Sequence, residues 1–113
     1  MSTINYKVKK VAPAAQASTA AYVVVAGSGM DVVDYASLAY TLKAVTNDVK
    51  WKVFGANISD YSDEVEVQGE ATVSAGAVGS YAVSIAPYAY YRVKIIDAVA
   101  GHSTVTVSGI AKR

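Results

Sequence analysis

The chain has a single histidine, His102, and no cysteine, so few of its residues could carry catalysis. His102, the nearby Asp97 and one of the serines could in principle form a Ser-His-Asp triad, in which the imidazole takes a proton from the serine hydroxyl. His102 follows Gly101 in a predicted turn, however, and a turn is a solvated and mobile place for a general base. A histidine-based metal site would need a second histidine or a thiolate. We therefore expect an exposed turn histidine, no catalytic centre and no cofactor.

The one cluster of possible hard-cation ligands is the acidic stretch 60–66. Asp60, Ser62 and Glu64 occupy alternate positions, loosely like the start of a calcium loop. The central glycine and the distal bidentate glutamate of such a loop are missing at the required offsets. Two carboxylates could also hydrolyse a glycoside, but no second acid lies in an obviously apolar setting. We expect a solvated loop that leads into a strand whose outer face carries Glu64 and Glu66.

The glycine-rich segment 27–29 (Gly-Ser-Gly) could cradle a phosphate only if a helix began directly after it. Residues 30–34 do not form a persuasive helix. We therefore interpret the segment as a turn.

Length and charge narrow the function classes further. At 113 residues the chain forms one domain, and its 53% hydrophobic residues can build one core without disulfides. Ten basic and nine acidic residues leave a net charge of +1, so no strong field attracts nucleic acid or an anionic membrane. No signal peptide is predicted, and the longest apolar run, 20–26, is far shorter than the roughly 20 residues that span a bilayer. We expect a soluble protein made in the cytoplasm, with no nucleic acid or membrane partner.

Alternation of polar and apolar residues predicts strands along most of the chain. In segment 90–96, Arg92 and Lys94 alternate with Val93 and Ile95, which is the period of a strand with one buried face. Similar segments recur about every 8–12 residues, with turn residues between them. The sequence therefore predicts an all-β fold, an antiparallel β-sandwich of the jelly-roll or immunoglobulin-like type with seven or eight strands.

The best hairpin candidate joins strands 37–45 and 49–54 through the turn residues 46–48. A β-bulge is expected at Gly69 in strand 64–73. The predicted core consists of inward-facing strand residues: Tyr40, Leu42, Trp51, Val53, Val83, Ile85, Val93, Ile95, Val105 and Val107.

Two domain parts are predicted. Residues 1–16 form an N-terminal arm or first strand, and residues 17–113 form the sandwich. Segment 13–17 is interpreted as an extended arm or linker. Because residues 4–8 alternate like a strand, the arm could add to a neighbouring subunit's sheet.

Tyrosine provides nine of the chain's aromatic residues, and its ring with a polar tip suits interfaces. By strand alternation Tyr88 and Tyr90 share one face and Tyr91 the other. A stacking surface for single-stranded nucleic acid is conceivable beside them, although the net charge argues against it. The candidate protein interface consists of tyrosines and cations: Tyr6, Lys9, Lys10, Tyr88, Tyr90 and Arg92.

Several segments carry a resemblance to a known kind of protein. They are VKWKVFGAN at 49–57, SD at 59–60, AGA at 75–77, APYAYYRVK at 86–94 and TVTVSG at 104–109. In style and spacing this resembles the small all-β accessory proteins of tailed-phage virions, such as capsid decoration (cement) proteins.

The resemblance implies a homo-oligomer seated on a capsid in the virion, with the major capsid protein or other virion proteins as partners. It implies no functional residue individually. Residues 1–16 would then pair with a neighbouring subunit or lie on the capsid. The alternative is a carbohydrate- or receptor-binding module with an exposed tyrosine platform. A small hydrolase is nearly excluded by the residue inventory.

Overall fold

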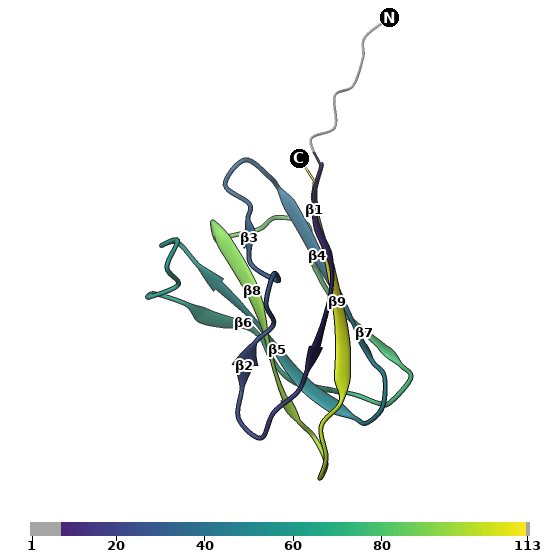
Figure 1. Ribbon diagram of the computed structural model, residues 1–113. Coiled ribbons are helices and arrows are strands. Elements are labelled where there is room, and N and C mark those ends of the chain that lie inside the picture. Colours follow the sequence, from purple (N-terminus) through teal and green to yellow (C-terminus); the bar gives the residue numbers. More distant parts are fainter. Residues whose placement is uncertain (1–7, 113) are drawn as a thin grey trace, which may run out of the picture.

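The computed structural model describes residues 8–112, and the side chains of residues 15–112. Two antiparallel sheets pack face to face, as Figure 1 shows. Their nine strands are β1 (Val8–Ala17), β2 (Val23–Val24), β3 (Met30–Asp31), β4 (Ser37–Ala44), β5 (Val49–Ala56), β6 (Val65–Val73), β7 (Val78–Val83), β8 (Tyr90–Asp97) and β9 (Thr104–Lys112). The predicted all-β sandwich is confirmed.

The strand order identifies the kind of sandwich. One sheet has the order β1-β9-β4-β7 and the other β2-β8-β5-β6, with β3 also paired to β8. The first strand therefore pairs with the last, β2 and β3 pair with β8, β4 with β7, and β5 with β6. These nested pairs are those of a long hairpin wrapped around a core, which is the jelly-roll arrangement. Because β2 and β3 follow one another along the same edge of β8, they act as one interrupted strand.

The core lies between the sheets and is built by strand alternation. In β4, Leu38, Tyr40 and Leu42 are buried, and in β5 the buried residues include Trp51 and Val53. Of the ten predicted core residues, eight are buried: Tyr40, Leu42, Trp51, Val53, Val93, Ile95, Val105 and Val107.

The other two predicted core residues differ. Val83, the last residue of β7, is half-buried and packs against the core. The prediction for Ile85 is wrong, because this side chain is 80% exposed. Strand β7 ends at Val83, so the alternation that would turn Ile85 inward does not continue to it.

The predicted hairpin of residues 37–45 and 49–54 is also wrong. The two segments are strands, but β4 belongs to one sheet and β5 to the other, and the connection crosses between the sheets. Each strand has one apolar face, and the two faces meet across the core. Apolar alternation is the same for two strands of a hairpin and for two strands that oppose each other in a sandwich.

Residues 8–17 are part of the sandwich rather than a separate arm. Strand β1 pairs antiparallel with β9 of the same chain, from Val8 opposite Lys112 to Ala17 opposite Thr104. The interpretation of 13–17 as a linker is therefore wrong. The register shifts between Val11 and Ala14, where Pro13 lacks the N–H that a regular ladder uses. Residues 1–7 lie outside the described part of the chain.

The bulge predicted at Gly69 is confirmed by the pairing of β5 with β6. Trp51 is opposite Ala71 and Val53 is opposite Gln68, so β6 has an extra residue at this point. A second shift follows between Val53 and Phe54.

Truncation of Trp51, which is buried in the core, should be far more costly than truncation of the exposed Ile85. Trp51→Ala should lower the free energy of unfolding by about 3–5 kcal/mol, because it removes buried area and leaves a cavity. Ile85→Ala should change it by less than about 0.5 kcal/mol. Urea denaturation followed by circular dichroism measures both values. Equal losses in the two variants would contradict this description of the core.

Candidate functional site

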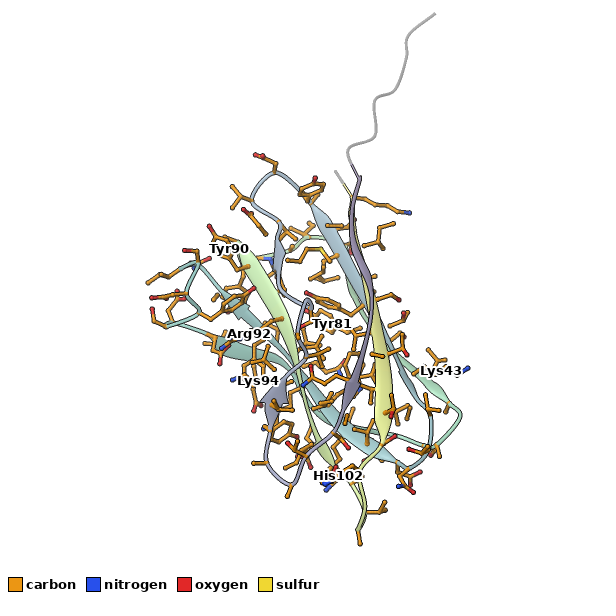
Figure 2. All side chains as sticks on the ribbon, in the orientation of Figure 1. Lys43, Tyr81, Tyr90, Arg92, Lys94 and His102 are labelled. Atoms are coloured by element: carbon orange, nitrogen blue, oxygen red, sulfur yellow. The ribbon has the colours of Figure 1, made fainter. Side chains whose placement is uncertain are left out.

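The outer face of the sheet that contains β5, β6 and β8 is charged. Residues that alternate with the core positions point outward here, and Figure 2 shows Tyr90, Arg92 and Lys94 in a row along β8. We call this surface the charged face. Its charged side chains come from the three strands and from the residue before β6: Lys50, Lys52, Glu64, Glu66, Glu70, Arg92 and Lys94.

Glu64, the residue before β6, pairs with two cations of the charged face. One of its carboxylate oxygens accepts a hydrogen bond from Arg92 Nε (2.8 Å), and the other accepts one from Lys94 Nζ. Burial alone would raise the pKa of Glu64, but the hydrogen bonds from Arg92 and Lys94 outweigh it and hold the pKa below its usual value. Because one carboxylate balances two half-buried cations, this cluster fixes the start of β6 against β8.

Aromatic rings lie between these charges. The guanidinium of Arg92 is 4.3 Å from the centre of the Tyr61 ring, and Lys94 Nζ is 4.4 Å from that of Phe54. Lys52 Nζ is 4.8 Å from the centre of the Tyr22 ring, and it also forms an ion pair with Glu66. Each of these cations therefore has both a carboxylate and a ring as a neighbour.

Tyr22 and Glu70 form a further contact on this face. The Tyr22 hydroxyl donates a hydrogen bond to Glu70, which also pairs with Lys50 at 3.4 Å. Burial raises the pKa of Tyr22, and the hydrogen bond to Glu70 raises it further. The contact ties the segment before β2 to β6.

Tyr61 is a site residue that sequence reasoning missed. It lies in the loop before β6, and its φ of 62° is in the left-handed region, where a tyrosine is uncommon. Its hydroxyl donates to the Tyr91 carbonyl (2.8 Å), and its ring packs edge-on against Tyr90. A tyrosine in a mainly polar loop was the only signal for it in the sequence.

The predicted interface residues are not brought together as one patch. Tyr90 and Arg92 meet through the Tyr61 ring on the charged face. The prediction that Tyr88 shares a face with Tyr90 is wrong. Tyr88 precedes β8, so strand alternation does not extend to it, and its ring lies against Tyr91 and over Gly55.

The remaining interface candidates belong to the N-terminal part of the chain. Lys9 and Lys10 lie in β1, opposite Ala111 and Ile110 of β9, and therefore in the other sheet. Tyr6 lies outside the described residues. The ring pairs Tyr61–Tyr90 and Tyr88–Tyr91 are inclined at 66° and 74°, so neither pair is the coplanar platform expected for sugar stacking.

The outer face of the β1-β9-β4-β7 sheet is different in character, and we call it the plain face. The outward residues of β4, β7 and β9 are mostly small and uncharged. A hydrogen bond of 2.6 Å joins the Thr41 and Ser108 hydroxyls across β4 and β9. On β4, β7 and β9 the plain-face residues are Ser37, Ala39, Thr41, Val78, Ser80, Ala82, Thr104, Thr106, Ser108 and Ile110, with Lys43 and Lys112 as the charged ones of these three strands.

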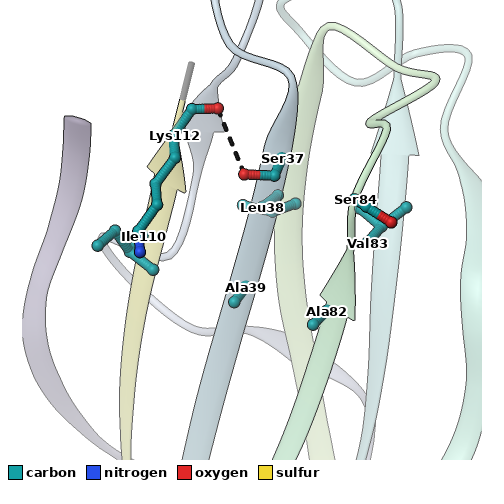
Figure 3. Close-up of a pocket in the computed structure, with 8 residues that line it drawn as sticks. All are labelled: Ser37, Leu38, Ala39, Ala82, Val83, Ser84, Ile110 and Lys112. Carbon is teal, nitrogen blue, oxygen red and sulfur yellow. Dashed lines mark hydrogen bonds between the residues drawn. The ribbon is translucent and has the colours of Figure 1, made fainter. Parts of the chain in front are cut away.

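A shallow depression of about 360 Å³ lies on the plain face, as Figure 3 shows. At this point the short Ala39 side chain of β4 lies between Ile110 of β9 and the equally short Ala82 of β7. The Ser37 hydroxyl is bonded to the Lys112 carbonyl (3.3 Å) at one end. Lys112 is the only titratable residue among those that line the depression. The depression could therefore hold a group by its shape, but it has few side chains that could take part in a reaction. The lining residues are Ser37, Leu38, Ala39, Ala82, Val83, Ser84, Ile110 and Lys112.

His102 is exposed at one end of the sandwich, as expected for a turn histidine. Its Nδ1 is 2.8 Å from one Asp97 carboxylate oxygen, and the hydroxyl of the buried Ser18 donates to the other. Asp97 therefore stands between serine and histidine. In a triad the histidine stands between the other two, so that it can take the serine proton. The Ser103 N–H donates to Ser18 Oγ (2.8 Å), so this network joins two loops.

The acidic stretch does not converge on one point. Asp60 accepts the Ser62 N–H, and Asp63 accepts the N–H groups of Asn57 and Ile58. Glu64 is occupied by the cations of β8, as described above. No group of three or more histidine, cysteine, aspartate or glutamate side chains within the described part of the chain could hold a metal ion.

Comparison with known proteins identifies the fold only. No protein-family model matches the chain, and no curated protein sequence is significantly similar to it. Among solved structures, a protein of disulfide-linked Bacillus endospore appendages has a TM-score of 0.59 and 13% identity, with 98% of this chain and 96% of the other covered.

Two prophage proteins are similar in the same way. The SPBc2 prophage-derived protein YomS has a TM-score of 0.60 and 12% identity, with 100% of this chain and 98% of the other covered. The PBSX exported protein XepA has a TM-score of 0.64 and 13% identity over 93% of this chain. The matched region spans 36% of XepA. At these identities the likeness shows a shared β-sandwich fold.

Glu64→Gln should lower the free energy of unfolding at pH 7 by about 1–3 kcal/mol, because it weakens charged hydrogen bonds to two half-buried cations. Glu66→Gln is the matched control, since that more exposed pair with Lys52 should contribute at most about 1 kcal/mol.

The same variant tests the pH dependence. Because folding lowers the pKa of Glu64, its stabilisation is present above the ordinary value of 4.5 and is lost as pH falls through the lower, folded-state pKa. Urea titrations from pH 7 to pH 3 should show the Glu64→Gln deficit shrinking with acidity. A deficit that is constant or grows on acidification would contradict this account.

Proposed function

We propose that the chain is a non-catalytic structural protein of a tailed-phage virion and, within that class, a decoration protein that stabilises the capsid by bridging subunits. The observation that carries the proposal is the plain face, the outer surface of β4, β7 and β9. Its small side chains lose little conformational freedom on contact, and its central strand has few charges to desolvate. Such a surface suits close packing against another protein.

The charged face supports the same orientation. Its lysines, arginine and glutamates are paired with each other across β5, β6 and β8. A partner would have to disrupt these pairs or desolvate them, which costs free energy. We therefore assign the charged face to solvent and the plain face to the major capsid protein.

The kinds of proteins that share the fold agree with a role in assemblies. They include prophage proteins and a component of endospore appendages. The appendages are described as disulfide-linked, whereas the 113 residues of this chain include no cysteine. Contact in the proposed assembly would therefore be non-covalent, and many weak copies on a lattice would gain stability through multivalency and mass action.

The proposal includes the absence of a catalytic role. It is supported by the order of contacts in the Ser18–Asp97–His102 network, in which the carboxylate is shared and the imidazole does not reach the serine. The same contacts suit a structural clamp that joins the β1–β2 and β8–β9 connections.

A charge on the plain face should weaken capsid binding. Thr41→Lys places an ammonium group at the centre of this face and should weaken binding to undecorated capsids of the encoding phage at least tenfold, because that group must be desolvated. Thr72→Lys is the matched control, since Thr72 is exposed on β6 next to Lys50 on the charged face. It should change binding by less than about twofold. Co-sedimentation with capsids measures both.

Two results would contradict the proposal. The wild-type chain could fail to bind the capsids at all, which would remove the decoration role. Alternatively, Thr72→Lys could weaken binding as much as Thr41→Lys, which would place the contact elsewhere.

A further inference from the structure

The sheet edges of this sandwich are not protected alike. An edge strand has unpaired N–H and C=O groups, and soluble proteins usually protect it with charges, proline, bulges or a very short strand. Strand β6 contains Glu66 and Glu70 and has two register shifts. Strands β2 and β3 contain two residues each. Three of the edge elements therefore carry such a device.

The edge at β1 is protected as well. Its sequence contains Lys9, Lys10 and Pro13, and its pairing with β9 shifts between Val11 and Ala14. Proline removes a donor from the edge, and a bulge twists it.

Strand β7 has none of these devices. It lies within residues 71–91, which contain no charged side chain, and no proline occurs in the strand itself. Its register with β4 is continuous, from Val83 opposite Leu38 to Val78 opposite Lys43. Within residues 8–112, β4 is the only strand paired with β7. The other edge of β7 is therefore regular, uncharged and open.

Exposed aliphatic side chains flank this open edge. Val78, at the start of β7, is 62% exposed, and Ile85, two residues after its end, is 80% exposed. A partner strand that runs antiparallel to β7 and carries an aliphatic residue at each end would cover both. Strand β7 of a second copy meets that description.

We propose that two copies of the chain pair through their β7 edges, antiparallel and across a two-fold axis. A two-fold axis places an edge strand of one copy against the same strand of the other copy. The β6 edge would then bring the glutamates of two copies close together, and the β1 edge is interrupted by Pro13 and the register shift, whereas β7 meets itself as a regular strand without like charges. Val78 of each copy lies toward the Ile85 end of the other, and the two Lys43 side chains stand at opposite ends. The product is a continuous antiparallel sheet twice as wide.

This contact goes beyond the proposed function, because it concerns the chain alone in solution. Sedimentation velocity of the purified chain should give the mass of two chains. Ser80→Lys puts a charge on the open edge and should reduce the mass to that of one chain. Thr41→Lys is the matched control, because Thr41 is opposite Ser80 in the β4–β7 register and is also exposed, but its strand has no free edge. It should remain a pair.

Folding is checked by circular dichroism, and Val78→Lys provides a second edge variant if Ser80→Lys does not fold. Cross-linking gives a separate readout, because the chain has no cysteine of its own. A short bismaleimide should join two Ser80→Cys chains but not two Thr72→Cys chains.

A monomeric wild-type chain would overturn the proposal, and so would a Ser80→Lys variant that still forms pairs. Loss of pairing in Thr41→Lys would move the contact from the edge to the plain face and would also overturn it. Failure of capsid binding leaves these masses unaffected, so the two proposals fail separately.

Discussion

The jelly roll depends on satisfying one buried hydroxyl, that of Tyr40 at the centre of the core. Tyr40 comes from β4, yet its hydroxyl donates to the Ser28 carbonyl (2.6 Å) and lies 3.2 Å from the Tyr91 carbonyl at β8 in the opposite sheet. Burial raises the pKa of Tyr40, so the hydroxyl stays neutral and available as a donor. A buried polar group without a partner would cost about 1–3 kcal/mol, so this bond holds both sheets to one separation and register.

The residues that surround the Tyr40 ring are suited to its size and to its hydroxyl group. Gly109 of β9 leaves room for it, since a Cβ there would lie 2.9 Å from Tyr40 Cδ1 and 2.8 Å from the Met30 side chain. Ser28 is fully buried, and its hydroxyl accepts the Val93 N–H at 3.1 Å. The segment 27–29, which is a turn as predicted, therefore closes the core at this point. The serine hydroxyl serves backbone groups of Val93, which lies in the gap between the β2 and β3 pairings along β8.

The parts of the structure that followed from the sequence are those set by local alternation. Arg92 and Lys94 point outward from β8 while Val93 and Ile95 are buried, as the period of two requires. The pairing of the strands could not be predicted from the sequence, because β4 and β5 would show the same apolar alternation in a hairpin as in two opposed sheets. The pairing is decided by residues far apart in sequence, such as Tyr40 and Tyr91, which no local pattern connects.

The candidate site was less predictable than the core for a related reason. Tyr90 and Arg92 were identified from composition, but their partners Tyr61 and Glu64 come from a loop and from the residue before β6. Nothing in the local sequence says that a tyrosine with φ of 62° will hold its ring against Arg92. The prediction for Tyr88 failed for a different reason. It applied strand alternation to a residue that lies before the start of β8.

The plain face and the β7 edge belong to the same sheet, and this has a geometric consequence. A two-fold axis that pairs antiparallel edge strands within one sheet stands perpendicular to that sheet, so it leaves the direction of the outer face unchanged. The plain faces of two paired copies would therefore point to the same side and form one broader surface. Binding of one copy to a lattice would raise the effective concentration of the other, so that two weak contacts act together. The charged face would point to the opposite side in both copies, where its paired lysines and glutamates remain in water. An edge contact and a face contact are thus compatible in one particle, because they use perpendicular directions of the same sheet.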